Sequence, residues 1–175
     1  MNIRALPAAE AIQRIDELID IIRDAVAGGA SVNFLAHATD DDFRAFWTST
    51  ITDVTAGQKV LYVAEADDAE VSRIVGTTLL ALSQKQNSPH RGDIGKMLVH
   101  SSHRRRGLGS RLLAAAEHGA RQRGRTLLML DTETDSSGER LYRATGWTAF
   151  GVVPGHALKP DGTPKPTTFF FKVLS

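Results

Sequence analysis

The chain of 175 residues contains no cysteine. Disulfide bonds, a thiol nucleophile and thiolate metal sites are therefore excluded. Its six histidines include no close His-x-x-x-His pair, the spacing that places two metal ligands on one face of a helix. We therefore expect no metal site and no covalent thiol intermediate.

An excess of either charge is also missing. Lysine and arginine total 21 and aspartate and glutamate total 20, which leaves a net charge of +1. A general nucleic-acid-binding protein usually needs a strong basic excess, so we expect no nucleic-acid partner. No apolar run is long enough to span a membrane, and the N-terminus lacks the apolar core of a signal peptide. These absences predict a soluble, cytoplasmic protein without a membrane partner.

The overall composition is that of an ordinary globular protein. Hydrophobic residues make up 42% of the chain and charged residues 23%, both common values for globular domains. No linker, repeat or low-complexity tract divides the sequence. We therefore predict a single domain over residues 1–175, long enough to bury a substantial core.

Hydrophobic periodicity predicts an α/β fold. Apolar residues recur at helical spacing over residues 8–27, before the stop signal Gly28-Gly29. Thr126 to Asp131 is an apolar run, typical of a strand buried on both faces, and Pro154 to Pro166 is predicted to be a loop. The predicted order on a mixed sheet is β-α-α-β-β-β-α-β-α-β-β, with strands near residues 2–6, 60–64, 74–82, 93–99, 126–131, 147–153 and 167–173, and helices near 8–27, 40–57, 107–123 and 136–145.

The most informative segment is the basic turn from Arg104 to Ser110, which lies between a predicted strand and a predicted helix. Backbone N–H groups at a helix start lack intrahelical partners, and together with the helix dipole and nearby arginines they favour a bound anion such as a pyrophosphate. Gly107 and Gly109 let the backbone approach that anion closely. The spacing alone leaves a plain turn or a solvated arginine surface open. A dinucleotide fingerprint and a P-loop are excluded, because their further glycine and Gly-Lys-Ser/Thr are missing.

Four segments in order resemble the GNAT N-acetyltransferases: Lys96 to Val99, the turn Arg104-x-x-Gly107-x-Gly109, Leu127 to Asp131, and Ser137 to Trp147. The last is similar to the family's small helix, with a tyrosine followed by glycine and an aromatic residue. The tabtoxin-resistance branch, which acetylates an amine of a small amino-acid-derived β-lactam toxin, is resembled at Gly28 to Val32, Leu130 to Glu133, Pro154-Gly155 and Pro160 to Gly162. The resemblance implies a partly splayed mixed sheet flanked by helices, with acetyl-CoA as the co-substrate.

The resemblance also implies which residues bind acetyl-CoA. Strand backbone groups would pair with the pantetheine arm as another strand would, while loop N–H groups and arginines would hold the pyrophosphate. Arg105 occupies a position where the family often has glycine, so its side chain is expected to point outward. The expected coenzyme-binding residues are Met97, Leu98, Val99, Arg104, Arg105, Arg106, Gly107, Leu108, Gly109 and Ser110.

Acetylation of an amine needs a group that accepts the proton of its ammonium form, whose pKa lies near 10. Asp131 is the first candidate, because a carboxylate that ends an apolar strand is expected to be desolvated and to have a raised pKa. Asp93, which begins the strand before the loop, is the second candidate. A turn or cap role remains open for both. Glu133 is expected to contact the substrate.

Tyr142 lies on the predicted short helix, where the resemblance implies a tyrosine that faces the coenzyme sulfur. Its hydroxyl would protonate the departing thiolate. The alternative is a core aromatic residue with its hydroxyl at the surface.

The leading hypothesis is an acetyl-CoA-dependent N-acetyltransferase that acts by direct attack in a ternary complex. Its acceptor would be the amine of a small molecule, of amino-acid-derived or β-lactam type, which residues 28–39 and 154–166 could cover. Peptide or protein N-acetylation and a non-catalytic acyl-CoA-binding domain are the alternatives. The sequence is compatible with a monomer or a homodimer.

Overall fold

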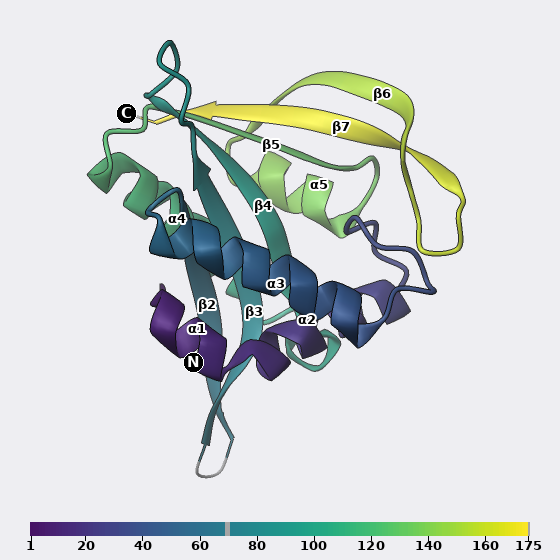
Figure 1. Ribbon diagram of the computed structural model, residues 1–175. Coiled ribbons are helices and arrows are strands. Elements are labelled where there is room, and N and C mark those ends of the chain that lie inside the picture. The colour runs from purple at the N-terminus through teal and green to yellow at the C-terminus, as the bar shows by residue number, and fades with distance from the viewer. Residues whose placement is uncertain (69–70, 175) are drawn as a thin grey trace.

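The computed structural model describes residues 1–68 and 71–174. Within these residues, seven strands form one sheet in the order β1-β2-β3-β4-β5-β7-β6 (Figure 1). β4 and β5 run parallel, whereas the other neighbouring strands are antiparallel. The predicted mixed α/β sheet is confirmed. Its elements are β1 (Asn2–Ala5), α1 (Ala8–Gln13), α2 (Ile15–Ala27), α3 (Asp40–Thr55), β2 (Lys59–Asp68), β3 (Val71–Leu82), β4 (Arg91–Val99), η1 (Ser101–His103), α4 (Leu108–Gln122), β5 (Leu127–Glu133), α5 (Ser137–Ala144), β6 (Thr148–Leu158) and β7 (Pro164–Val173).

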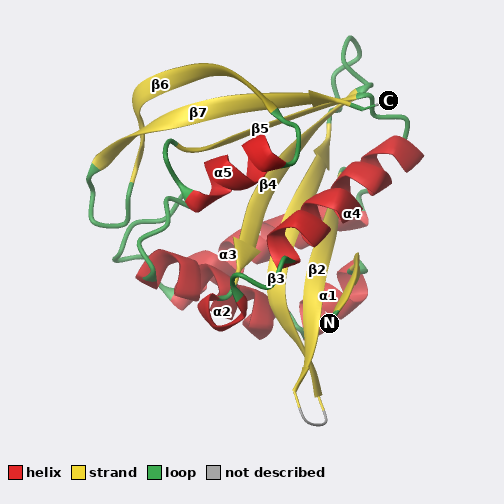
Figure 2. Ribbon diagram, turned by 180° about the vertical axis from the view of Figure 1, so that it is seen from behind, coloured by secondary structure: helices red, strands yellow, loops and turns green. Residues whose placement is uncertain are grey.

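Helices cover both faces of the sheet, and each face buries its own core. The front face is the one covered by α1, α2 and α3, which pack around residues such as Leu18 and Trp47. The back face carries α4 and α5, whose core includes Leu112 and Phe170 (Figure 2). Among the described residues, none of the helices combines the length and the hydropathy of a membrane span.

β4 and β5 diverge after a short stretch of pairing. Three consecutive residue pairs join them, and the last is Asp93 with Met129. β4 then continues to Val99 on the edge of β3, and β5 continues to Glu133 on the edge of β7. Figure 1 shows the two strands separating beyond this point. We call the resulting opening the β4–β5 gap.

The single helix predicted over residues 8–27 is wrong, because the helix is divided into α1 and α2 at Arg14. Arg14 has φ −110° and ψ 21°, outside the helical region. Its guanidinium donates hydrogen bonds to Glu17 on α2 (2.8 Å) and to Glu65 on β2. Glu65 lies 51 residues away, so the periodicity of the helix itself cannot reveal this contact.

The loop predicted over residues 154–166 is wrong in its extent, because most of it is strand. β6 continues to Leu158 and β7 begins at Pro164, which leaves residues 159–163 as the turn. β6 is an edge strand of the sheet. Proline is tolerated on an edge strand, since its missing N–H interrupts no interior ladder, and this explains how β6 contains Pro154.

β5 is buried on one face only, which contradicts the expectation of burial on both. Leu128 and Leu130 lie in the back-face core, whereas Asp131 is exposed. Pairing with β4 ends at Met129. Beyond this residue, the edge of β5 that would face β4 borders the gap. The expected desolvation of Asp131 is therefore wrong as well.

Candidate functional site

The loop between β4 and α4 presents backbone donors at a helix start. Gly107 is the N-cap of α4, with φ 74° and no side-chain cap. A hydrogen bond from the Arg111 N–H to the Gly107 carbonyl (3.2 Å) closes the first turn. The N–H groups of Leu108, Gly109 and Ser110 precede this bond in the chain. They belong to the first turn of α4 and form the positive end of the helix dipole, where an anion is stabilised.

The three arginines of this loop have different environments. Arg105 has φ 60°, a left-handed conformation that favours glycine. Arg105 and Arg106 are exposed. Arg104 turns back toward the protein, and its guanidinium donates to the Val99 carbonyl (3.0 Å) and to the Asp24 carboxylate (3.3 Å). Arg105 and Arg106 thus present charge to solvent, while Arg104 also anchors the loop.

Asp24 on α2 holds the beginning of the loop. Its carboxylate accepts hydrogen bonds from the N–H (2.8 Å) and the hydroxyl (2.5 Å) of Ser101, in addition to the bond from Arg104. The Asp24 side chain is only 16% exposed, although its partners Ser101 and Arg104 lie at the surface. Sequence reasoning missed Asp24, because 77 positions separate it from Ser101.

Asp93 and Asp131 lie on the front side of the two strands that border the gap. Their neighbours Ile94 and Leu130 belong to the back-face core, and alternation along each strand turns the two aspartates to the front. Burial raises the pKa of Asp93 above its usual value, nearby cations oppose this, and the charge of Asp131 adds to the increase. The two predicted bases are therefore close enough to interact electrostatically.

Tyr142 lies in the back-face core. Its ring packs against Trp147 and Phe170, with ring centroids 6.0 Å and 5.9 Å away, and the residue is 5% exposed. Burial raises the pKa of the hydroxyl well above its usual range, and the charge of Asp131 adds to this. Tyr142 is therefore both a core aromatic residue and a phenol that stays protonated at neutral pH.

Lys96 was not predicted as a site residue, and a bulge in β4 brings it to the front of the gap. It has φ 48°, and the register of β4 with β3 shifts at this position. Ile94 before the bulge faces the back core, and Leu98 after it faces the front core. Strict alternation would turn Lys96 to the back. The bulge reverses this, and the Lys96 ammonium lies 4.9 Å from the centroid of the Phe46 ring on α3.

The two segments predicted to cover a substrate contact each other. The Ser31 hydroxyl donates to the Leu158 carbonyl (2.9 Å), and the Ala36 N–H donates to the Pro160 carbonyl (2.9 Å). These bonds connect the loop that follows α2 with the end of the β6–β7 hairpin. The contact joins segments that are more than 120 residues apart in sequence.

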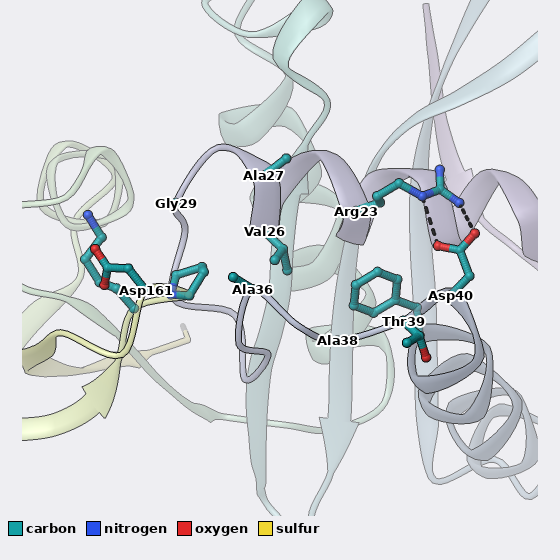
Figure 3. Close-up of a pocket in the computed structure, with 12 residues that line it drawn as sticks. Arg23, Val26, Ala27, Gly29, Ala36, Ala38, Thr39, Asp40 and Asp161 are labelled. Carbon is teal, nitrogen blue, oxygen red and sulfur yellow. Dashed lines mark hydrogen bonds and ion pairs between the residues drawn. The ribbon is translucent and has the colours of Figure 1, made fainter.

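A cavity of about 490 Å³ lies beside this contact (Figure 3). α2, the loop after it, the start of α3 and the β6–β7 turn all contribute to its wall, which includes Phe43 and Lys159. Asp93, Asp131 and Tyr142 do not line it, so the cavity is distinct from the β4–β5 gap.

Glu133, which was predicted to contact the substrate, is partly exposed and shares the face of Asp131 by strand alternation.

Residues 21–147 match the model of the Acetyltransferase (GNAT) family. The chain belongs to this family. The matched region contains the loop, both strands of the gap and Tyr142. This GNAT protein is an acetyl-CoA-dependent N-acetyltransferase with acetyl-CoA as its co-substrate. The family predicted from the four sequence segments is confirmed.

Solved structures of other acetyltransferases share the fold of this GNAT chain. A phosphinothricin acetyltransferase from Sinorhizobium meliloti in complex with acetyl-CoA is 17% identical with a TM-score of 0.80, over 99% of this chain and 88% of that one. A ribosomal-protein-alanine N-acetyltransferase from Brucella melitensis is 22% identical with a TM-score of 0.78, over 99% and 100%. The protein yncA from Salmonella typhimurium, solved with acetyl-CoA, is 20% identical with a TM-score of 0.74, over 100% and 94%.

Proposed function

We propose that this GNAT protein acetylates the amine of a small molecule by direct attack in a ternary complex with acetyl-CoA. The observation that carries the proposal is that the candidate bases and the candidate acid lie on opposite faces of the sheet, with Tyr142 near enough to Asp131 to respond to its charge. Asp93 and Asp131 face the front, and Tyr142 lies in the back-face core. The amine of an acceptor bound on the front face could therefore attack the thioester of acetyl-CoA in the gap directly, without an acetylated enzyme intermediate.

Acetyl-CoA would lie along β4 with its pyrophosphate at the start of α4. The N–H groups from Arg105 to Ser110 would donate to the pyrophosphate, and the exposed Arg105 and Arg106 would add charge. The inner edge of Met97 to Val99 borders the gap and would pair with the pantetheine amides as a strand does. Met97 and Val99 pack against the back core and Leu98 lies in the front core. These residues would therefore bind the pantetheine arm through their backbone groups.

The proposed reaction proceeds in three steps: deprotonation of the ammonium, attack on the thioester and protonation of the thiolate. One carboxylate of the pair Asp93 and Asp131 accepts a proton from the acceptor ammonium. The free amine attacks the thioester carbonyl, so that a C–N bond forms, the C–S bond breaks and the nitrogen releases its second proton to solvent. Tyr142 donates a proton to the departing thiolate and regains one from solvent.

The acceptor is proposed to be small, of amino-acid-derived or β-lactam type. Structures with the same fold include phosphinothricin N-acetyltransferases and a ribosomal-protein-alanine N-acetyltransferase, so the fold is compatible with small and protein acceptors. The contact between the loop after α2 and the β6–β7 hairpin favours a small acceptor, because joined segments restrict the space for a peptide chain.

The acceptor class is tested by measuring CoA release and product mass with acetyl-CoA and matched panels of amines. We expect small amino acids and amino β-lactams to be acetylated with higher kcat/KM than peptides carrying the same N-terminal residue. Faster acetylation of the peptides would contradict the proposal. Binding of acetyl-CoA without transfer to any amine would favour the non-catalytic alternative.

The proposed acid is tested with Tyr142→Phe, which keeps the ring and removes the hydroxyl. We expect kcat to fall by about 10²-fold, the usual contribution of general acid catalysis, with the KM for acetyl-CoA changed less than threefold. Tyr62→Phe is the matched control, because Tyr62 is the only other tyrosine of the chain and is buried on β2. Equal losses in both variants would show that Tyr142 has a structural role only.

A further inference from the structure

The conformation of Lys96 is held by buried groups of β3. The hydroxyl of Thr77, which is fully buried, donates to the Lys96 carbonyl (2.9 Å), and Thr78 donates to the Gly95 carbonyl (3.4 Å). A positive φ is unfavourable for a lysine and persists only where its surroundings impose it. The bulge therefore fixes the direction of the Lys96 side chain.

Lys96 brings a cation to the front of the gap without an ion-pair partner among the residues that the structure describes. It is partly buried and lies over the ring of Phe46, which in turn meets Phe34 edge-on at 5.9 Å between centroids. Burial lowers the pKa of Lys96, the charge of Asp131 opposes this, and Lys59 adds to the decrease. An incoming anion would stabilise this ammonium group.

Beyond Arg91, whose Nε lies 3.8 Å from the Asp93 carboxylate, the charges around the front of the gap form a pattern that matches a zwitterion. Asp93 and Asp131 attract the ammonium group of an acceptor, while Lys96, three positions after Asp93, attracts a negative group and repels a second positive one. A simple diamine would place its second charge against Lys96. A molecule that carries an amine and a carboxylate satisfies both signs.

We propose that Lys96 binds the carboxylate of the acceptor, and that the acceptor is therefore an amino acid or a close derivative with a free carboxylate. This inference rests on the acetyl transfer proposed above and adds the substrate class. The amine would face Asp93 and Asp131, and the carboxylate would lie against Lys96. Lys96 is a specificity-determining residue in this arrangement.

The kinetic test compares L-amino acids with their carboxamides, which keep the amine and remove the negative charge. We expect wild-type protein to prefer the acids at least tenfold in kcat/KM. Lys96→Met should raise the KM for the acids more than tenfold, leave the KM for the carboxamides unchanged and change kcat less than threefold. Lys96→Arg should restore part of the preference. Equal loss of kcat on acids and carboxamides would overturn the inference.

A binding measurement separates this inference from the proposed reaction. The same amino acids and carboxamides are titrated calorimetrically into protein saturated with CoA, which carries no acetyl group to transfer. We expect tenfold tighter binding of the acid, lost in Lys96→Met and retained in Lys59→Met, a control that removes a nearby charge paired with Asp53. Equal binding of acid and carboxamide, or no binding of any acid, overturns the role of Lys96. Acid-selective binding without turnover overturns the proposed reaction alone.

Discussion

At the residue scale, Asp93 and Asp131 share a face but differ in environment. The structure leaves Asp131 exposed, whereas burial raises the pKa of Asp93. A carboxylate with a raised pKa is the stronger base once it is ionised. Asp93 is therefore the better candidate to receive the proton, with Asp131 contributing negative charge beside it.

This difference predicts a shift in the pH dependence of acetyl transfer. Only the ionised form of Asp93 can accept a proton, so kcat/KM should fall as the pH drops through its raised pKa. Asp131→Asn removes a charge that raises this pKa, and the acid limb should move to lower pH. The measurement is kcat/KM against pH for both proteins with one acceptor, so that titration of the amine is common to both. An unmoved limb would argue against Asp93 as the base.

At the element scale, α2 positions the loop that precedes α4. The contact consists of three hydrogen bonds from Ser101 and Arg104 to Asp24. These bonds set where the chain leaves β4 and therefore where the N-terminus of α4 points. Through this contact, a helix on the front face controls a loop proposed to bind the coenzyme.

Asp24→Ala should weaken acetyl-CoA binding more than it slows the reaction. We expect the KM for acetyl-CoA to rise about tenfold, which corresponds to about 1.4 kcal/mol, with kcat changed less than threefold. Asp16→Ala is the control, because Asp16 is also on α2, is 83% exposed and pairs with Arg44. Steady-state kinetics at saturating acceptor measure both parameters. A lower kcat with an unchanged KM would show that the loop is not positioned by Asp24.

At the scale of the whole molecule, an ionic cluster connects the first elements of the chain to the sheet. Glu65 on β2 bonds Arg4 on β1 and Arg14 between α1 and α2. The Glu65 side chain is 6% exposed. Arg4 is the largest cause of the lowered pKa of Glu65, followed in the same direction by Arg14, while burial opposes both.

The cluster predicts a loss of stability in acid. A carboxyl group with a lowered pKa in the folded state stabilises the protein above its unfolded pKa of about 4.3, and this contribution disappears as the pH falls through the lower folded value. Glu65→Gln should reduce the free energy of unfolding at pH 7 by about 2–3 kcal/mol and make its acid dependence shallower. Denaturant unfolding from pH 7 to pH 3 measures both effects, with Asp16→Asn as an exposed control. Parallel acid profiles for Glu65→Gln and wild type would contradict the assignment.

The sequence predicts the parts of the molecule that depend on nearby residues. The turn from Arg104 to Ser110 is recognisable because its glycines and the following helix are local. The break at Arg14 cannot be recognised in this way, because it depends on the distant Glu65. The exposure of Asp131 cannot either, because it depends on how far β4 pairs with β5. Lys96 was missed because the bulge comes from pairing with β3, and a lysine does not signal a positive φ.

The edge strand β6 has a consequence for self-association. An exposed strand edge can template pairing with another chain, and β6 also exposes Phe150, Val152 and Val153. Pro154 removes one N–H donor, and Gly155 follows with φ 62°. The register with β7 shifts between Val153 and Ala157. These interruptions break the outer edge into two short pieces, which hinders the continuous strand-by-strand growth that leads to aggregation.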